Sequence, residues 1–198
     1  MKTVLLGTTN ENKIAELRIN LESLSIIIQT PKDLGIDFDP PETGSTFVQN
    51  ALSKAIAWSN KTALPVLVED SGLSVDSLHD LPGVHSKRFF PGTDLDKNQY
   101  ILKLMKDIPE DKRQAHYTCA MVFYDSTTQE KIVIEEYCHG SIADKVYGNN
   151  GFGYDPIFIP NGFTQTFGEL PQKIKFSISH RAKALAKLLP FLQQWSKG

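Results

Sequence analysis

The fold class is decided by residues 3–13, which read TVLLGTTNENK. The apolar first part, TVLLGTT, is expected to form a buried strand. Apolar residues then recur at three- and four-residue spacing, which predicts an amphipathic helix. These apolar residues are Ile14, Leu17, Leu21 and Leu24. A strand that leads directly into a helix favours an α/β protein in which helices cover a central sheet.

The alternation of strand and helix continues through the first third of the chain. Residues 25–30, SIIIQT, are predicted to form a second strand, and residues 65–70, PVLVED, a short buried one. Between them, residues 31–45 contain three prolines and two glycines and are expected to form a loop. A second helix is then predicted from an apolar stripe of Phe47, Ala51, Ala55 and Trp58.

The middle of the chain is less periodic. Residues 78–94 are expected to be irregular, and a helix should follow them. The apolar residues of that helix are Ile101, Leu102 and Met105. Two β-rich runs, residues 114–125 and 131–142, are joined by the turn-like STTQ, which favours an antiparallel hairpin.

The C-terminal part is predicted to be a helix within residues 177–195 that kinks or restarts at Pro190. Its apolar stripe consists of Leu185, Leu188, Leu189 and Leu192. The elements together predict a mixed central sheet flanked by helices, with a cleft between a βαβ portion and a hairpin portion. Residues 1–198 are expected to form one domain made of two lobes.

Composition and charge exclude several classes of protein. The chain has 198 residues, of which 40% are hydrophobic and 22% charged, as in an ordinary globular domain. The net charge is −2, so no basic surface indicates nucleic-acid binding, and an anionic ligand must meet locally placed groups. We expect no signal peptide, because Lys2 and Asn10 interrupt a short apolar run. No segment approaches the ~20 apolar residues of a membrane span, so no membrane partner is expected.

The two cysteines, Cys119 and Cys138, lack the spacing of metal ligands. Buried free thiols are expected, and these fit a reducing cytoplasm. A disulfide between two neighbouring strands is the alternative.

Residues 8–13, TTNENK, join the first strand to the first helix. A helix that begins after a strand can bind an anion with its free N–H groups. Asn10 is a suitable N-cap residue, Thr8 and Thr9 add neutral donors, and Lys13 adds a charge one turn later. The alternative is a capped helix with a solvated lysine. The P-loop pattern GxxxxGK[ST] is absent.

The second predicted helix offers another cation. Asn50 and Lys54 are four residues apart, so they share one helix face beside the apolar stripe. Alone, they would suit a surface pair. Glu42, a few residues upstream, brings an acid near Lys54.

Residues 66–73, VLVEDSGL, carry the strongest indication of chemistry. An apolar strand delivers Glu69 and Asp70 to its carboxyl end, where α/β sheets bind ligands, and a turn at Ser71 and Gly72 should follow. Adjacent acids on an extended chain face opposite ways, so both contact one ion only if the turn bends the backbone. With Glu42 they would supply the hard oxygen ligands that suit Mg²⁺. The alternative is a turn whose aspartate caps the next segment.

Residues 151–158, GFGYDPIF, combine small and flat side chains. Glycines let the backbone approach a ligand, and Phe152 or Tyr154 can stack on a ring. Asp155 is expected to be extended because Pro156 follows it. A β-bulge with core aromatics is the alternative.

The last helix is expected to begin at residues 179–181, SHR, with Ser179 as its cap. His180 and Arg181 then lie in the first turn, where the helix dipole disfavours cations, so Arg181 should have an oxygen-rich partner. A purine 6-oxo group or a surface carboxylate would serve. Lys175 can reach either ligand or solvent.

Six stretches together resemble the noncanonical purine nucleoside triphosphate pyrophosphatases, the inosine/xanthosine triphosphate pyrophosphatase family. They occur in the order and spacing of that family and span residues 8–185. The stretches are TTNENK, ETGSTFVQNALSKA, EDSGLSVD, PGVHSKRF, GFGYDPIF and SHRAKAL.

The resemblance implies Mg²⁺-dependent hydrolysis of ITP, dITP and XTP to the monophosphate and pyrophosphate by an elongated α/β homodimer in the cytoplasm. It implies phosphate contacts from Thr8, Thr9, Asn10, Glu11, Asn12 and Lys13, assisted by Asn50 and Lys54. It makes Asp70 the general base and a metal ligand, with Glu42 and Glu69 as further ligands. It implies substrate contacts from Ser71, Phe152, Gly153, Tyr154, Asp155, Lys175, His180 and Arg181. Residues 82–89 would shape the active-site cleft between the lobes and the subunit contact.

The chain departs from the family pattern in two places. Phe89 stands where a tyrosine is frequent, so one hydroxyl is missing. Lys173 and Ile174 replace glutamates before Lys175, which changes the local electrostatics.

A non-catalytic purine nucleotide-binding protein is the alternative function, but such a protein could dispense with the three acids. A phosphomonoesterase would require a DxD-type strand end, which VEDSG lacks.

Overall fold

The computed structural model describes residues 1–197, which fold into two compact units. Unit 1 consists of Met1–Asp70, Cys119–Glu136 and Lys183–Gly198. Unit 2 consists of Ser71–Thr118 and Tyr137–Ala182. Each unit therefore draws on distant parts of the chain.

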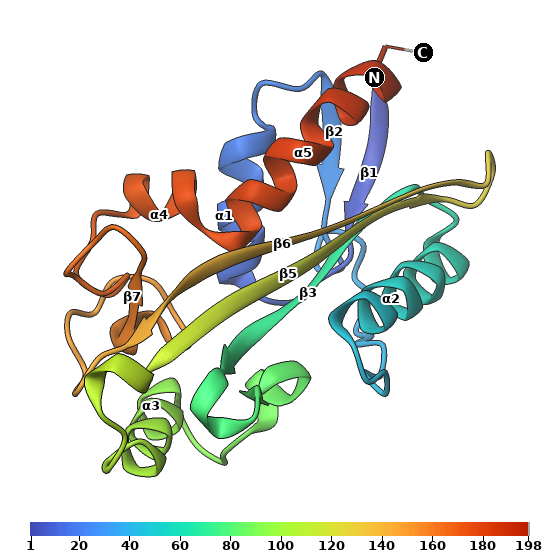
Figure 1. The fold of residues 1–198 in the computed structure, drawn as a ribbon. Helices are drawn as coiled ribbons and strands as arrows, with labels where there is room; N and C mark the ends of the chain where they lie inside the picture. Colours follow the sequence, from blue (N-terminus) through green and yellow to red (C-terminus); the bar gives the residue numbers. More distant parts are fainter. Residues whose placement is uncertain (198) are drawn as a thin grey trace. The chain divides into compact units, whose positions relative to one another are not determined.

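The strands form one mixed sheet in the order β2-β1-β3-β5-β6-β7, with β4 paired to β3 (Figure 1). β1 is parallel to β2 and β3, whereas the pairs β3–β4 and β6–β7 are antiparallel. The bounds are β1 Lys2–Leu6, β2 Ile26–Gln29, β3 Val66–Val75, β4 Leu81–Pro82, β5 Gln114–Asp125, β6 Glu130–Ile142 and β7 Phe158–Pro160. The predicted mixed sheet flanked by helices is confirmed.

Helices cover the sheet and connect its strands. The α-helices are α1 Glu11–Leu21, α2 Phe47–Thr62, α3 Asp94–Leu104, α4 Gln172–Ile178 and α5 His180–Trp195. Short 3₁₀ helices are η1 Asp76–Leu78, η2 Gly83–Arg88, η3 Glu110–Lys112 and η4 Asp155–Ile157. The loop predicted at residues 31–45 contains neither helix nor strand.

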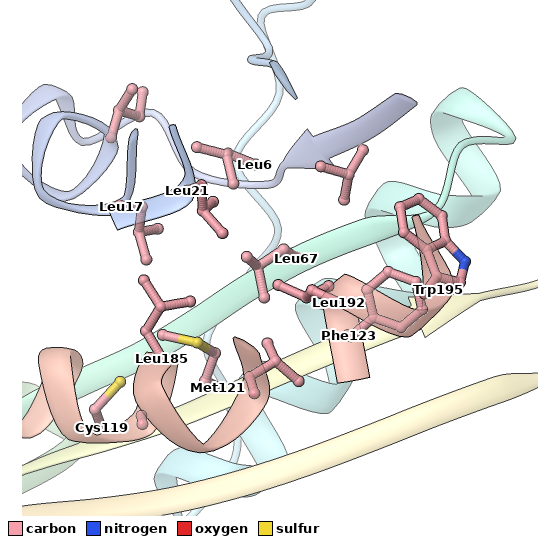
Figure 2. Packing of buried hydrophobic residues seen from close by; sticks show 14 residues of the cluster. Leu6, Leu17, Leu21, Leu67, Cys119, Met121, Phe123, Leu185, Leu192 and Trp195 are labelled. Carbon is pink, nitrogen blue, oxygen red and sulfur yellow. The ribbon is translucent and has the colours of Figure 1, made fainter. Parts of the chain in front are cut away.

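The core of unit 1 follows the predicted periodicity (Figure 2). Leu17 and Leu21 of α1 and Leu185 of α5 pack with Leu67 of β3 in one buried cluster. Successive residues of a strand point to opposite faces of the sheet, so Val66 and Val68 lie on the face opposite to Leu67. Both valines are also buried. The stripe of α2 is buried as predicted, with Trp58 at 1% exposure. The predicted helix stops short of Leu24, which packs against the core from the following turn.

The core of unit 2 is built from β-strand ends, α3 and the segments around β7. Its fully buried members include Leu73, Ile101 and Phe158. The strands β5 and β6 are sheet neighbours joined by residues 126–129, too short a link for a parallel crossover, so the predicted hairpin is confirmed. Both cysteines are buried thiols, as expected.

The turn predicted at Ser71 and Gly72 is wrong. β3 continues without interruption to Val75, and Ser74 pairs with Pro82 of β4. Neighbouring strands supply partners for the backbone groups of this segment, and these ladder bonds outweigh the turn preference of serine and glycine. The acids Glu69 and Asp70 therefore lie on an extended strand.

The structure differs from the expectations at three places in the C-terminal half. The predicted restart at Pro190 is wrong, because buried Leu185, Leu188 and Leu192 hold both halves of α5 against one core, and the kink stays a prediction. α4 was missed because it is only seven residues long. Asp155 opens η4 and is not extended. Of the helices in residues 1–197, none is long and apolar enough to cross a membrane.

Candidate functional site

The first turn of α1 carries the predicted phosphate-binding residues. The Asn10 side chain caps the helix by accepting hydrogen bonds from the N–H groups of Asn12, at 3.0 Å, and Lys13, at 3.2 Å. The Thr8 hydroxyl accepts from the Asn10 N–H at 3.2 Å. Thr9 and Glu11, like Asn10 and Asn12, are exposed. The turn thus keeps a fixed shape while its side chains face solvent.

Lys13 is not a solvated lysine. Its ammonium lies 2.7 Å from the Glu69 carboxylate, and the two side chains are 15% and 0% exposed. The Cys119 thiol donates to the second Glu69 oxygen at 3.5 Å. The link ties the first turn of α1 to β3, so Lys13 has a defined position before any ligand arrives.

Asn50 and Lys54 of α2 are buried, so the surface-pair alternative is wrong. The Asn50 amide donates to one Asp70 oxygen at 3.0 Å, and the Lys54 ammonium donates to the other at 2.8 Å. Lys54 also forms an ion pair with Glu42. The Asn50 carbonyl oxygen accepts from the Gly44 N–H at 2.8 Å, which fixes the loop that carries Glu42. One ammonium therefore joins two carboxylates from distant parts of the chain.

Burial and charge act against each other on Asp70 and Lys54. Burial raises the pKa of Asp70, Lys54 opposes this, and the nearby Glu42 charge supports it, so the pKa of Asp70 is above its usual value. Burial lowers the pKa of Lys54, but Asp70 and Glu42 outweigh it, so the pKa of Lys54 is raised. Two acids share one ammonium here, and Asp70 holds a proton more readily than an exposed aspartate.

Glu69 and Asp70 point to different sides of β3. Glu69 contacts Lys13 of α1, whereas Asp70 contacts Asn50 and Lys54 of α2. This is the alternation expected of adjacent residues on a strand. The backbone bend that would let both acids contact one ion is missing, so the predicted role of Glu69 as a metal ligand stays a prediction.

The donor set of Asp70 and Glu42 fits a hard divalent cation. Their carboxylate oxygens converge on the position of the Lys54 ammonium, so they already share one cation. Mg²⁺ is usually held by one or two carboxylates together with waters and substrate phosphates. In residues 1–197, no group of three or more His, Cys, Asp or Glu side chains is arranged to hold a metal ion by itself. Among the described residues, Asp70 and Glu42 are thus a pair of carboxylates that already share one cation.

In unit 2, Asp155 organises the loop of the predicted ring slot. It is 2% exposed, and one carboxylate oxygen accepts from the Phe152 N–H at 2.8 Å and from the Lys175 ammonium at 2.6 Å. The other oxygen accepts from the Tyr117 hydroxyl at 3.4 Å. Gly151 has φ of +75°, and a side chain there would collide with the Asp155 carboxylate. Hydrogen bonds to the Asp155 carboxylate therefore hold this loop in its shape.

Two cations lie against one aromatic ring. The Lys175 ammonium is 4.4 Å and the Arg181 guanidinium carbon 5.6 Å from the centroid of the Phe152 ring. Arg181 is 3% exposed and donates to the Ser71 hydroxyl at 3.2 Å, so it is not a surface residue. Ser179 accepts from the Ala182 N–H at 3.2 Å, which confirms its predicted cap. Donors and a flat ring are thus brought together in unit 2.

Tyr154 belongs to the core of unit 2 and does not present a free ring. It is 4% exposed, and its hydroxyl donates to the Ser86 carbonyl at 2.9 Å. Burial raises the pKa of the Tyr154 hydroxyl, and the Asp94 charge raises it further. The core-aromatic alternative therefore describes Tyr154, whereas Phe152 is only partly buried.

Three residues around this loop were missed from the sequence. The Tyr117 ring stacks on His180 with centroids 4.6 Å apart and planes at 8°. Burial raises the pKa of the Tyr117 hydroxyl well above its usual value, and Asp155 raises it further, so the hydroxyl stays a donor. Asp94 and Asn98 of α3 both form hydrogen bonds with the backbone of Gly153. No spacing or motif marks these three residues, because their roles depend on contacts across the fold.

The predicted residues thus form two groups, one in each unit. We call the first the phosphate cluster: Lys13, Glu42, Asn50, Lys54, Glu69 and Asp70. We call the second the base cluster: Ser71, Phe152, Asp155, Lys175, His180 and Arg181. Each cluster combines charged groups that are almost fully buried, which is typical of binding and catalytic sites.

Comparison with known proteins shows the family of the chain. The Ham1 family model matches residues 4–191. A dITP/XTP pyrophosphatase of Leptospira interrogans is 43% identical over 195 residues, which cover 97% of this chain and 98% of the relative. The dITP/XTP pyrophosphatase of Escherichia coli K12 is 40% identical over 199 residues, covering 98% and 99% of the two chains. A HAM1 protein structure from Coxiella burnetii superposes with a TM-score of 0.89 at 34% identity, covering 98% of this chain and all of that one. The chain belongs to the Ham1 family.

Proposed function

We propose that this protein hydrolyses the triphosphates of deaminated purines, ITP, dITP and XTP, to the monophosphate and pyrophosphate. The dITP/XTP pyrophosphatases among its relatives match nearly its whole length, which supports this reaction class. The observation that carries the proposal is the buried Asp70 carboxylate, held by Asn50 and Lys54 and joined to Glu42 through the same lysine. A binding protein would have no need to bury and fix these acids.

Asp70 is the general base of the proposed reaction. Water is a poor nucleophile, and a base that removes its proton during attack accelerates hydrolysis by about 10²–10⁴. The raised pKa of Asp70 makes it a stronger base than an exposed aspartate. Asn50 and Lys54 bind both carboxylate oxygens, so they set the direction from which Asp70 meets the water.

Asp70 and Glu42 are the residues that would hold Mg²⁺, and Glu69 is retained as a further predicted ligand. When bound, Mg²⁺ would neutralise phosphate charge and lower the pKa of a coordinated water. Lys54 already occupies the position between Asp70 and Glu42, which shows that this position favours positive charge.

Attack at the α-phosphorus releases pyrophosphate, whose growing negative charge needs stabilisation. Lys13 and Lys54 supply positive charge, and both are held by carboxylates before the substrate binds. The N-terminus of α1, which lies within Thr8 to Lys13, adds the positive end of a helix dipole. Lys13 and the start of α1 therefore have defined positions before the substrate binds.

The base cluster is proposed to select the purine. Phe152 stacks on the ring, and the donors of Lys175, His180 and Arg181 favour a 6-oxo acceptor over the amino group of adenine. Asp155 acts within the protein by holding Phe152 and Lys175 in place. Gly153 and Tyr154 shape the loop, and Ser71 holds Arg181.

A product assay with a panel of nucleoside triphosphates tests the proposal. Each nucleotide is incubated with the protein and Mg²⁺ or with EDTA, and pyrophosphate and orthophosphate are measured separately. We expect pyrophosphate from ITP, dITP and XTP, much less from ATP, and none in EDTA. Orthophosphate as the first product, or binding of ITP without turnover, would contradict the proposal and favour the non-catalytic alternative.

We also propose that the protein is a cytoplasmic homodimer and that residues 1–198 act as one functional domain. These proposals are supported by the family resemblance of the six stretches, which lie in both units. Light scattering of the purified protein would measure its oligomeric state.

A further inference from the structure

Helix α3 holds the loop of the base cluster through a single residue, Gly153. The Asp94 carboxylate accepts a hydrogen bond from the Gly153 N–H at 2.7 Å. The Asn98 side-chain amide donates a hydrogen bond to the Gly153 carbonyl at 3.0 Å. Gly153 has φ of +63°, a left-handed conformation that glycine adopts readily. Both polar backbone groups of this residue are therefore fixed by one helix.

A contribution to stability does not explain why residue 98 is an asparagine. It is 2% exposed, and within residues 1–197 its buried side-chain oxygen has no hydrogen-bond partner. An unsatisfied buried amide oxygen destabilises a fold. An apolar side chain would avoid that cost, so the bond to Gly153 is the contact that accounts for an asparagine at this position.

Helix α3 is suited to act as a rigid support. A reciprocal capping box fixes its start: the Asp96 N–H donates to the Thr93 hydroxyl at 3.2 Å, and the Asp96 carboxylate accepts from the Thr93 N–H at 2.7 Å. Ile101, fully buried in the core of unit 2, anchors the helix farther along. The clamp on Gly153 is thus attached to a firmly held element.

Gly153 directly follows Phe152, which is only partly buried. The Phe152 ring lies near the cations of Lys175 and Arg181, so a small rotation at Gly153 would move the ring away from them. We propose that Asp94 and Asn98 are positioning residues for base recognition, which hold Phe152 in the orientation that stacks on the purine. The inference rests on the proposed function for the identity of the ligand.

Hydrogen exchange of the ligand-free protein tests the clamp without any nucleotide. Asn98→Ala and Asp94→Ala should each speed exchange of the Gly153 amide about fivefold, which corresponds to about 1 kcal/mol. Asn150→Ala is the matched control, because its amide donates to the Leu170 carbonyl at 3.2 Å and does not contact Gly153. Unchanged exchange at Gly153 in both clamp variants would overturn the proposal.

Kinetics with ITP test the positioning role. Asp94→Ala should raise KM about fivefold and leave kcat near the wild-type value, because the clamp acts on the base cluster and not on Asp70. Asp94→Asn keeps an acceptor oxygen for the Gly153 N–H and should restore KM. Lys97→Ala is the control for the lost Lys97–Asp94 ion pair and should have wild-type KM. The Asp94 side chain is 49% exposed, so these variants should fold even if Asn98→Ala does not.

A fall in kcat with unchanged KM, or an Asp94→Asn variant as impaired as Asp94→Ala, would overturn the positioning role. The two levels of inference fail separately. If the wild-type protein releases no pyrophosphate from ITP, the proposed function is wrong, whereas the exchange measurement still decides whether α3 clamps the loop.

Discussion

The phosphate cluster and the base cluster bury their charges on different kinds of backbone. In the phosphate cluster, Asp70 and Glu69 lie on β3, and their partners Lys54 and Lys13 lie on helices. In the base cluster, the central carboxylate of Asp155 lies at the end of a loop and collects donors from that loop and elsewhere. Regular elements position these four charges of the phosphate cluster, with Glu42 on a loop, whereas the central carboxylate of the base cluster depends on side chains that hold a loop in shape.

Because of this difference, we expect mutations in the two clusters to affect different properties of the protein. Ladder and helix hydrogen bonds keep Asp70 and Lys54 in place independently of their own ion pair. Substitution of one residue of the phosphate cluster should therefore remove the reaction step or the charge that this side chain supplies and leave the backbone in place. The loop at Phe152 has fewer backbone constraints, so loss of a supporting side chain should change ligand recognition before it changes turnover.

The largest expected effect is that of Asp70→Asn on turnover. The amide keeps a hydrogen-bonding shape but cannot take a proton, so kcat for ITP should fall by about 10²–10⁴. Circular dichroism and thermal unfolding should show that the fold is retained. A variant with near-normal kcat would remove Asp70 from the role of general base.

The next largest effect is that of Lys54→Met on stability. The substitution leaves two largely buried carboxylates, Asp70 and Glu42, without their shared cation. Breaking a buried ion pair in this way typically costs about 3–5 kcal/mol in the free energy of unfolding, which urea denaturation measures. Lys187→Met is the control, because its ion pair with Glu136 involves a lysine that is 65% exposed, and such pairs contribute about 0–1 kcal/mol. Equal losses in both variants would contradict the view that burial makes the phosphate cluster sensitive.

A smaller and selective effect is expected for Arg181→Ala. Loss of a donor to a 6-oxo group should lower kcat/KM for ITP. The expected fall corresponds to a loss of about 1–3 kcal/mol in transition-state stabilisation. The residual activity with ATP should change much less, since adenine presents an amino group at that position. Equal losses with ITP and ATP would show that Arg181 has only a structural role.

The smallest effect concerns the pH dependence of stability. The raised pKa of Asp70 means that the folded protein binds this proton more tightly than the unfolded chain, whose value is near 3.8. The stabilising contribution is therefore complete below that pH and is lost as the pH rises through the folded pKa. In EDTA, the unfolding free energy of the wild type minus that of Asp70→Asn should fall as the pH rises above 3.8. A difference that rises with pH would show that the pairing with Lys54 outweighs burial.

Local periodicity was enough to predict most of the elements. The apolar stripes of α1, α2 and α5 predicted buried helix faces, and all three helices formed because each stripe packs on the sheet. Predictions failed where local preference and tertiary pairing compete. Ser71 and Gly72 favour a turn by themselves, but the neighbouring strands keep them in β3. Pro190 disfavours a helix, but the buried leucines on both sides keep α5 in one piece.

The amino-acid sequence is enough to predict the class of fold and the chemical types of the candidate site residues, because helix and strand periods and residue chemistry are local properties. The pairing of these residues follows from the folded chain alone: Lys13 pairs with Glu69, and Lys54 pairs with Asp70 and Glu42. The folded chain also decided that Tyr154 is buried and that Asp94 and Asn98 hold Gly153. These facts depend on the distances and burial of residues far apart in the chain, and the spacing of residues along a sequence contains neither.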